Sequence, residues 1–424
     1  MLSHSIQFLV LILILSFAHC SKINPSNICE TGTIDFYKTI LFKLNRNELS
    51  PHCGFNLAPQ KLNRTACDLT QSEVIQPENW PLVQAELIKQ ASLGNDPITI
   101  SHIQTNELGS EKWGPLTLAK NGFLYAMPSA VPFMLMVDPF HSTISKLTVP
   151  SQFTGTHFGG VLALDGKIYS LPYGSSTNII LVFEPSTGNF SSLTYPTNSE
   201  DKKWMRGILA PNGKIYYLPG TAETILVLDP ATGSTTTIPS PKSGNFKWIG
   251  GSLAPNGKIY GAPGIENSVL VINPADNSIY TIPSPFTGSL KWSGFNLGID
   301  GRLYATPLSN NPYYLSLNPT DDSVSLILAP TTGSQRWFGG SLAPSGKIYH
   351  SPSNDDSVLE FNSETLGSTL YTQGITGTDK WMPLKLGPNG RMFATPSNAD
   401  YVLIINSNAK GKYCNSILYS SYMN

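Results

Sequence analysis

Hydrophobic and polar positions follow a four-part pattern along the chain, clearest between Gly244 and Pro285. A small, apolar run covers Trp248 to Ala254, and a second short run covers Lys258 to Ala262. The third run, Ser268 to Asn273, is apolar at consecutive positions, which is typical of a strand covered on both faces. The fourth run, Ser278 to Ile282, is more polar, as in an outer strand. Each unit therefore predicts four antiparallel strands without a helix between them.

Turn residues separate these runs and recur at a fixed period. Pro255-Asn256-Gly257 stands between the first two runs, and Asn-Gly favours the left-handed backbone of a tight hairpin. The same glycine occurs seven times, in steps of 44, 47, 44, 44, 45 and 44 residues, at Gly122, Gly166, Gly213, Gly257, Gly301, Gly346 and Gly390. Four strands per unit at this period predict an all-β fold, a seven-bladed β-propeller of four-stranded antiparallel blades. A closed ring also buries the apolar faces that an open stack of sheets would leave bare.

Two further positions repeat at the start of each first strand. An aromatic residue marks blades that start near residues 113, 158, 204, 248, 292, 337 and 381, namely Trp113, Phe158, Trp204, Trp248, Trp292, Trp337 and Trp381. We expect these rings to pack in the core, because a repeated apolar position in a propeller is usually a blade contact. A basic or potentially basic residue stands directly before each ring, namely Lys112, His157, Lys203, Lys247, Lys291, Arg336 and Lys380.

The seven basic positions form the candidate ligand-binding site of this chain. In a closed ring they would approach one mouth of the central tunnel, on the face opposite the Asn-Gly turns. Fixed cations at such a mouth would attract an anion such as a carboxylate, a phosphate or a sulfated or uronic-acid glycan. Alternatively, each basic side chain packs along a neighbouring tryptophan as a cation–π or stem contact. The sequence leaves both interpretations open.

The repeat resembles the YVTN-type repeats of lactonase-like and NHL-like β-propellers. Gly251–Tyr260 (GSLAPNGKIY) and Asn267–Pro274 (NSVLVINP) correspond to the "SPDGK" turn and the downstream "NTVSVID" strand of that family. The resemblance covers about residues 98–410 and implies the propeller fold. No catalytic or metal-ligand motif of the lactonase enzymes matches a position here. The chain also departs from the family pattern by a proline at the end of each second strand, namely Pro128, Pro172, Pro219, Pro263, Pro307, Pro352 and Pro396.

The segments outside the repeat predict an exported chain with a small cap. Residues 1–20 have the apolar core and length of a cleaved secretory signal. Residues 21–95 predict a loop-rich cap with one short helix from Trp80 to Ala91, whose apolar face would include Leu82, Ala85, Leu87 and Ile88. Residues 96–424 form the propeller. The strand that closes the last blade comes either from Ile98 to Ile103 or from Tyr413 to Tyr419.

Four cysteines remain after removal of a signal ending at Cys20, namely Cys29, Cys53, Cys67 and Cys414. An even number in an exported chain predicts two disulfides, and full pairing would tie the N-terminal segment to the C-terminal end. Their pairing cannot be deduced from spacing. Asn63 and Asn189 stand in N-x-Ser/Thr triplets and are candidate glycosylation sites.

Net charge and the absence of known motifs reduce the number of function classes that fit this chain. The formal net charge is −1 and only 13% of residues are charged, which disfavours a nucleic-acid partner. The histidines at residues 102, 141, 157 and 350 occupy different repeat positions, and no cofactor or metal motif is present. Carboxylates could bind calcium only if they converge, and the candidates are Glu266, Asp321, Asp322, Asp355 and Asp356.

We therefore expect a secreted, extracellular and non-enzymatic propeller that acts as an interaction or matrix-binding module, possible partners being a protein or an anionic glycan. No membrane span is expected after signal cleavage. The alternatives are a lactonase-like hydrolase with an axial metal and a structural protein of a secreted or mineralised matrix.

Overall fold

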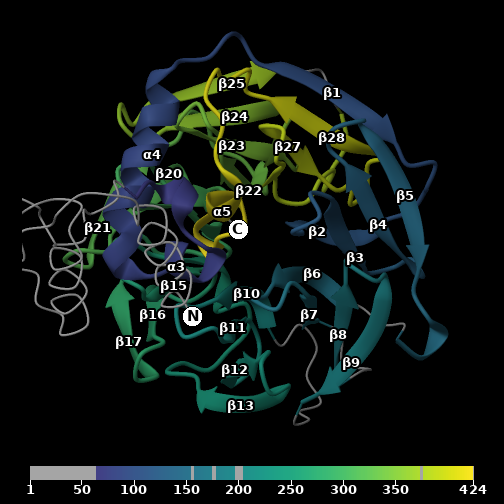
Figure 1. Cartoon of the computed structure of the whole chain (residues 1–424). Helices are drawn as coiled ribbons and strands as arrows, with labels where there is room; N and C mark the ends of the chain where they lie inside the picture. The colour runs from purple at the N-terminus through teal and green to yellow at the C-terminus, as the bar shows by residue number, and fades with distance from the viewer. Residues whose placement is uncertain (1–63, 154–156, 174–177, 196–203, 373–375, 424) are drawn as a thin grey trace, which may run out of the picture. The chain divides into compact units, whose positions relative to one another are not determined.

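Seven antiparallel sheets of four strands form the blades of a propeller ring within Thr65–Asn424 (Figure 1). The computed structural model describes residues 64–153, 157–173, 178–195, 204–372 and 376–423. The predicted fold class is therefore confirmed. The predicted signal segment, most of the predicted cap, Cys29, Cys53, Asn63 and Lys203 lie outside the described residues.

Six blades follow the chain in order, each from its innermost to its outermost strand. Blades 1 to 3 consist of β2–β5 (Trp113–Leu118, Leu124–Pro128, Phe133–Asp138, Thr143–Thr148), β6–β9 (His157–Leu162, Ile168–Pro172, Ile179–Glu184, Asn189–Thr194) and β10–β13 (Trp204–Leu209, Ile215–Pro219, Thr224–Asp229, Ser234–Pro239). Blades 4 to 6 consist of β14–β17 (Trp248–Leu253, Ile259–Pro263, Ser268–Asn273, Ser278–Pro283), β18–β21 (Trp292–Leu297, Leu303–Pro307, Tyr313–Asn318, Ser323–Leu328) and β22–β25 (Trp337–Leu342, Lys347–Pro352, Ser357–Asn362, Ser368–Thr372).

The seventh blade joins strands from both ends of the propeller. Its inner strands are β26 (Lys385–Leu386), β27 (Arg391–Ala394) and β28 (Tyr401–Asn406), and its outer strand is β1 (Thr99–Gln104). β1 pairs antiparallel with β28, with Thr99 opposite Asn406. The first of the two predicted closing segments is thus the correct one. The rival segment instead contains the short helix α5 (Asn415–Leu418).

Burial follows the predicted order of strands within a blade. In blade 4 all of β14 and β15 and most of β16 are buried, whereas β17 alternates between exposed and half-buried residues. The six tryptophans at the start of the first strands are at most 3% exposed. Each indole N–H donates to the carbonyl of the first residue of the third strand in its own blade, at 2.8 to 3.0 Å. Core packing of these rings is confirmed, and the indole also anchors the third strand.

The strand pairing shifts the predicted alignment of the second blade by one residue. His157, not Phe158, pairs with Pro172, as Trp113 pairs with Pro128 in the first blade. His157 therefore occupies the tryptophan position, and the basic position of this blade falls on residue 156. The turn glycine supplies the reason, since Gly166 follows His157 at the same distance as Gly122 follows Trp113.

The cap contacts the face of the ring that carries the turns between first and second strands, here called the hairpin face. It contains the 3-10 helices η1 (Ala66–Asp68) and η2 (Pro77–Asn79) and the α-helices α3 (Gln71–Val74) and α4 (Trp80–Ser92). A third 3-10 helix, η3 (Ser151–Phe153), lies between blades 1 and 2. Gln76 and Gln84 donate side-chain hydrogen bonds to the carbonyls of Pro211 and Ile299, at 2.9 and 3.0 Å. No helix in the described part of the chain is long and apolar enough to cross a membrane.

The predicted cap helix is confirmed, and its buried face matches the predicted one in part: Leu87 is buried and Leu82 packs against the core. Val83, Glu86 and Leu87 are buried, whereas Ala85 is exposed and Ile88 is 47% exposed. The apolar pattern placed Ala85 and Ile88 on the wrong side, because the helix contacts the ring partly through polar residues such as Gln84. A disulfide joins Cys67 to Cys414, with the two Cα atoms 5.4 Å apart, and ties the cap to the C-terminal segment as predicted.

Candidate functional site

Four of the predicted basic residues are buried within the ring. Lys112, Lys247, Lys291 and Lys380 are at most 3% exposed. Each ammonium donates to the carbonyl three residues before it and to carbonyls in the loop between the second and third strands of the preceding blade. The carbonyls in the preceding blade are 2.7 to 3.0 Å away and belong to Ser397 and Ala399 for Lys112, Ala222 for Lys247, Gly264 and Ile265 for Lys291, and Asp355 for Lys380. These four residues, here called the latch lysines, join neighbouring blades.

The remaining basic positions differ from the latch lysines. The Arg336 guanidinium pairs with Asp355 of its own blade and stacks on Trp337, 4.6 Å from the ring centroid. His157 is buried, with Nδ1 3.1 Å from the Ser170 hydroxyl and Nε2 3.2 Å from the Phe153 carbonyl. Burial lowers the pKa of His157, so its ring is neutral at pH 7. Lys203 lies outside the described residues.

The burial of the latch lysines bears on whether the basic ring binds an anion or has a structural role. It lowers the pKa of Lys291 to about 8, because the ammonium loses its hydration. Carbonyl oxygens accept hydrogen bonds from each latch lysine, an arrangement that neither interpretation predicted. The predicted cation–π contact with the following tryptophan is present for Arg336 and Lys380, 4.6 and 5.9 Å from the ring centroids. Recognition of an anion by the whole ring stays a prediction.

The residue before each latch lysine or Arg336 has an unusual backbone. Its φ lies between 48° and 50° in all five blades where it is described, at Glu111, Phe246, Leu290, Gln335 and Asp379. Its carbonyl accepts a hydrogen bond from the second residue after the proline of the second strand, at 2.9 to 3.1 Å. Left-handed backbone is strained for non-glycine residues, and most so for bulky ones. Five blades therefore keep one strained conformation with five different side chains, here called the left-handed positions.

Three of the left-handed positions, Glu111, Gln335 and Asp379, line a pocket on the face opposite the hairpin face, here called the loop face. This mouth pocket has a volume of about 450 Å³ and is lined by residues of blades 6, 7, 1, 2 and 3. Phe158, Tyr173 and Phe338 give it an aromatic wall, with the rings of Phe158 and Tyr173 stacked at 4.9 Å between centroids. Glu111 and Asp379 are its lining carboxylates, and the described lining contains no lysine or arginine.

Electrostatics and packing divide the loop face into two halves. On the side of the pocket, burial and the charge of Glu111 raise the pKa of Tyr173 to about 12. On the side of blades 3 to 5, the left-handed side chains Phe246 and Leu290 pack on an apolar cluster of Met205, Ile249 and Leu308. Carboxylates therefore lie on one side of this face and apolar side chains fill the other, with Met205, Tyr173 and Phe338 between them.

Below the pocket lies a smaller cavity in the tunnel, here called the central cavity, of about 70 Å³. Phe158, Met205 and Phe338 line both spaces, so the two adjoin. Every blade contributes the residue two positions after its tryptophan or His157, and these are Pro115, Gly159, Arg206, Gly250, Gly294, Gly339 and Pro383. Inner strands approach closely here, since a Cβ at Gly250 would lie 2.6 Å from the Ser293 carbonyl oxygen. Arg206 is thus the single long side chain in a ring of glycine and proline.

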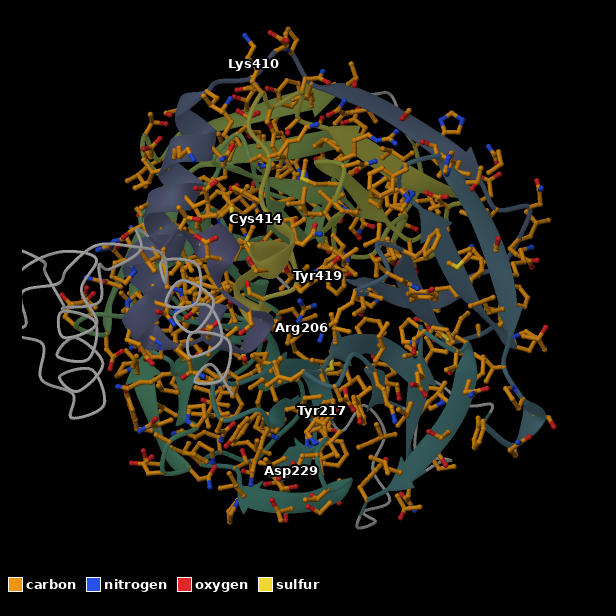
Figure 2. The ribbon with its side chains drawn as sticks, viewed as in Figure 1. Arg206, Tyr217, Asp229, Lys410, Cys414 and Tyr419 are labelled. Carbon is orange, nitrogen blue, oxygen red and sulfur yellow. A yellow bond between two sulfur atoms is a disulfide. The ribbon has the colours of Figure 1, made fainter. Side chains whose placement is uncertain are left out.

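Lys385 is the second cation that lines the central cavity. It is 4% exposed, and its ammonium donates to the Met423 carbonyl at 3.0 Å. Burial and the nearby charge of Arg206 lower its pKa to about 7. Figure 2 shows Arg206 close to the centre of the ring.

The C-terminal segment covers the tunnel at the hairpin face. The 3-10 helix η4 (Ser421–Met423) contacts the inner strands β14 and β18. The Tyr413 hydroxyl donates to the Ala343 carbonyl at 2.8 Å, and the Tyr422 ring meets Trp80 of the cap edge-on at 5.5 Å. One mouth of the tunnel is thus covered, while the pocket lies at the other.

Other residues singled out from the sequence do not form a shared site. His350 is buried against Thr306, and burial lowers its pKa to about 3. Asp355 pairs with Arg336, whereas Asp322 accepts hydrogen bonds from the hydroxyls of Tyr260 and Tyr280. Within the described ranges no group of three or more His, Cys, Asp or Glu could hold a metal ion. Asn189 is exposed at the start of β9, and its glycosylation stays a prediction.

Sequence reasoning missed Arg206, Lys385 and the left-handed positions. Arg206 could have been found as the one departure from glycine or proline two residues after the aromatic position. The left-handed positions leave no such signal, because Glu, Phe, Leu, Gln and Asp share no property that predicts positive φ.

Solved structures share this fold at low sequence identity. A streptogramin B lyase structure has a TM-score of 0.63 at 14% identity, over 73% of this chain and 98% of that one. A catalytically inactive virginiamycin B lyase from Staphylococcus aureus with quinupristin has a TM-score of 0.62 at 12% identity, over 73% and 99%. The extracellular domain of a putative hybrid two-component system from B. thetaiotaomicron has a TM-score of 0.57 at 13% identity, over 75% and 44%. These likenesses show the propeller fold alone.

No protein-family model matches the chain, and no curated protein matches its sequence.

Proposed function

We propose that this chain is a secreted, non-enzymatic interaction module that binds an extracellular partner through the mouth pocket. The observation that carries the proposal is the set of left-handed positions. A strained backbone recurs in five blades with five different side chains, and three of these, Glu111, Gln335 and Asp379, line the mouth pocket. Strain persists where surrounding structure enforces it, and loops that vary on a rigid ring are common binding surfaces.

The chemistry of the pocket favours a basic and apolar partner segment. Glu111 and Asp379 are exposed carboxylates at its edge, and aromatic rings form its wall. A lysine or arginine beside an aromatic residue would complement both features, the charge by attraction and the ring by burial. The predicted anionic ligand of the basic ring is a separate hypothesis.

Secretion is supported by two observations. Residues 1–20 have the layout of a signal peptide. The propeller neighbours include extracellular domains of two-component systems.

An interaction role has one further parallel among the solved structures. A mitotic checkpoint complex structure contains a similar chain, with a TM-score of 0.56 at 10% identity over 74% of this chain and 92% of that one.

A peptide array tests the proposal. The probe is a set of immobilised peptides that pair Arg or Lys with Phe or Trp, beside a set with Glu at the basic positions. We expect the protein to bind the first set, and the double variant Glu111→Gln, Asp379→Asn to bind at least tenfold more weakly. Glu364→Gln is the matched control, because Glu364 is exposed in the turn between β24 and β25. Equal binding by all three proteins, or preference for the acidic set, would contradict the proposal.

The basic ring has its own test on heparin-agarose. The triple variant Lys247→Gln, Lys291→Gln, Lys380→Gln removes three latch lysines, so its retention must be compared with its melting temperature. Because loss of latch lysines is expected to lower the melting temperature, retention is measured at a temperature where both proteins are folded. Weaker retention of the folded variant would support an anion site, whereas unchanged retention would end that hypothesis.

A further inference from the structure

The mouth pocket combines a pair of stacked aromatic rings with two carboxylates. Phe158 and Tyr173 line its wall and stack on each other, with 4.9 Å between ring centroids and 26° between ring planes. Glu111 and Asp379 line the same space. Glu111 lies close enough to Tyr173 for its charge to raise the pKa of the phenol. The pocket therefore offers flat aromatic surface beside negative charge.

The chain itself shows which cation each kind of surroundings holds. Arg336 and Lys380 occupy the same position in neighbouring blades, directly before a tryptophan. The Arg336 guanidinium stacks on Trp337, 4.6 Å from the ring centroid, and pairs with the carboxylate of Asp355. The Lys380 ammonium lies 5.9 Å from the centroid of Trp381 and donates to the Asp355 carbonyl at 2.7 Å. In this fold a ring and a carboxylate together hold a guanidinium, whereas an ammonium binds backbone carbonyls.

The difference between the two cations has a general physical reason. A guanidinium is planar and weakly hydrated, so its face stacks on an aromatic ring while its edge donates parallel hydrogen bonds to a carboxylate. An ammonium is compact and strongly hydrated, and its donors are spread around the nitrogen. The stacked rings beside Glu111 therefore match a guanidinium better than an ammonium.

We propose that the mouth pocket selects arginine over lysine, with the guanidinium against the Phe158–Tyr173 pair and its edge toward Glu111. This inference rests on the proposed function, because it names the residue of the basic partner segment that the pocket recognises. A volume of about 450 Å³ is that of a ligand pocket and accommodates this side chain together with an adjacent apolar residue. Phe158 and Tyr173 thus determine specificity, while the carboxylates attract either cation.

Direct binding of short peptides tests the selection. The probes are soluble fluorescent peptides of glycine and serine with a central Arg-Phe, Lys-Phe or citrulline-Phe pair, citrulline being a neutral isostere of arginine. We expect the full chain to bind the arginine peptide about tenfold more tightly than the lysine peptide, because only the guanidinium both stacks and pairs in this geometry. The citrulline peptide should bind more weakly than both, since it lacks the charge.

Variants at one ring assign the selection to the stack. Tyr173→Leu keeps an apolar side chain but removes the ring, so it should bind the arginine and lysine peptides about equally, whereas Tyr173→Phe should keep the preference. Glu111→Gln should weaken the binding of both charged peptides. Phe140→Leu is the matched control, because Phe140 is 61% exposed in the turn between β4 and β5. The melting temperature of each variant checks that it is folded.

The outcomes separate this inference from the proposed function. Equal binding of the arginine and lysine peptides by the wild type, with both weakened by Glu111→Gln, would overturn the selection but leave the proposed function in place. A preference that survives Tyr173→Leu, or one that Tyr173→Phe also loses, would overturn the role of the stacked rings. Failure of the folded wild type to bind any of the peptides would contradict the proposed function and this inference together.

Discussion

The two mouths of the tunnel are built from the same seven repeats but end differently. At the hairpin face, the cap and the C-terminal segment meet through the Cys67–Cys414 disulfide, and η4 covers the inner strands. At the loop face, a pocket of about 450 Å³ lies among side chains that differ from blade to blade. The comparison shows that the repeat determines the ring, whereas residues outside the repeat decide which mouth is accessible.

The largest expected effect comes from releasing the covered mouth. The double variant Cys67→Ser, Cys414→Ser removes a cross-link between residues 347 positions apart. We expect the free energy of unfolding to fall by about 2 to 5 kcal/mol, because the unfolded chain is less constrained. Urea unfolding without reductant measures it. Each single variant should lose as much as the double variant, and an unchanged midpoint would contradict the role of this disulfide.

Replacing a latch lysine tests how much these residues stabilise the ring near the loop face. Lys291→Met removes the ammonium that donates to the carbonyls of Gly264, Ile265 and Gly288. Buried acceptors left without a donor should lower the free energy of unfolding by about 1 to 3 kcal/mol. The matched control is Lys242→Met at an exposed lysine, expected within about 0.5 kcal/mol of the wild type. Equal stability of the two variants would show that the latch contributes nothing.

The dependence of stability on pH tests a buried histidine of the ring, His350, away from both mouths. His350 is buried with a pKa of about 3 in the folded chain, against 6.5 for the free side chain. Between these values the unfolded chain binds a proton that the folded chain does not. Stability from this residue is therefore complete above pH 6.5 and falls as the pH decreases, by on the order of 1 kcal/mol per pH unit. Urea midpoints between pH 7 and 4.5 would measure the slope.

His350→Gln should reduce that slope, whereas His102→Gln, at an exposed histidine of β1, should leave it unchanged. A slope that survives His350→Gln would place the proton uptake elsewhere, and His157 would be the next residue to substitute.

The smallest effect is expected at the left-handed positions. Glu111 is exposed, so Glu111→Gly removes little packing and relieves a φ of 50°. We expect a gain of about 1 kcal/mol in the free energy of unfolding, together with weaker binding to basic–aromatic peptides. Loss of stability would refute the assigned strain, and stronger peptide binding would refute the assigned role of the carboxylate.

Local sequence signals predicted most of the fold but only part of the site. The turn glycines and the apolar runs gave the blades, and β1 closed the ring in one of the two predicted ways. The alignment of blade 2 failed because Phe158 was matched by residue type, although the distance to Gly166 indicates His157. Recurrence of a basic residue suggested a binding ring, but recurrence alone cannot distinguish a site from a structural contact.

The sequence by itself determined the number of blades and the order of strands within a blade, because turn chemistry and hydrophobic runs act over a few residues. Only the tertiary structure decided that the latch lysines are buried, that five side chains have left-handed backbone and that Arg206 and Lys385 share a cavity. The physical reason is that these properties depend on neighbouring blades. The carbonyls that accept from Lys112, for example, belong to residues 285 and 287 positions further along the chain.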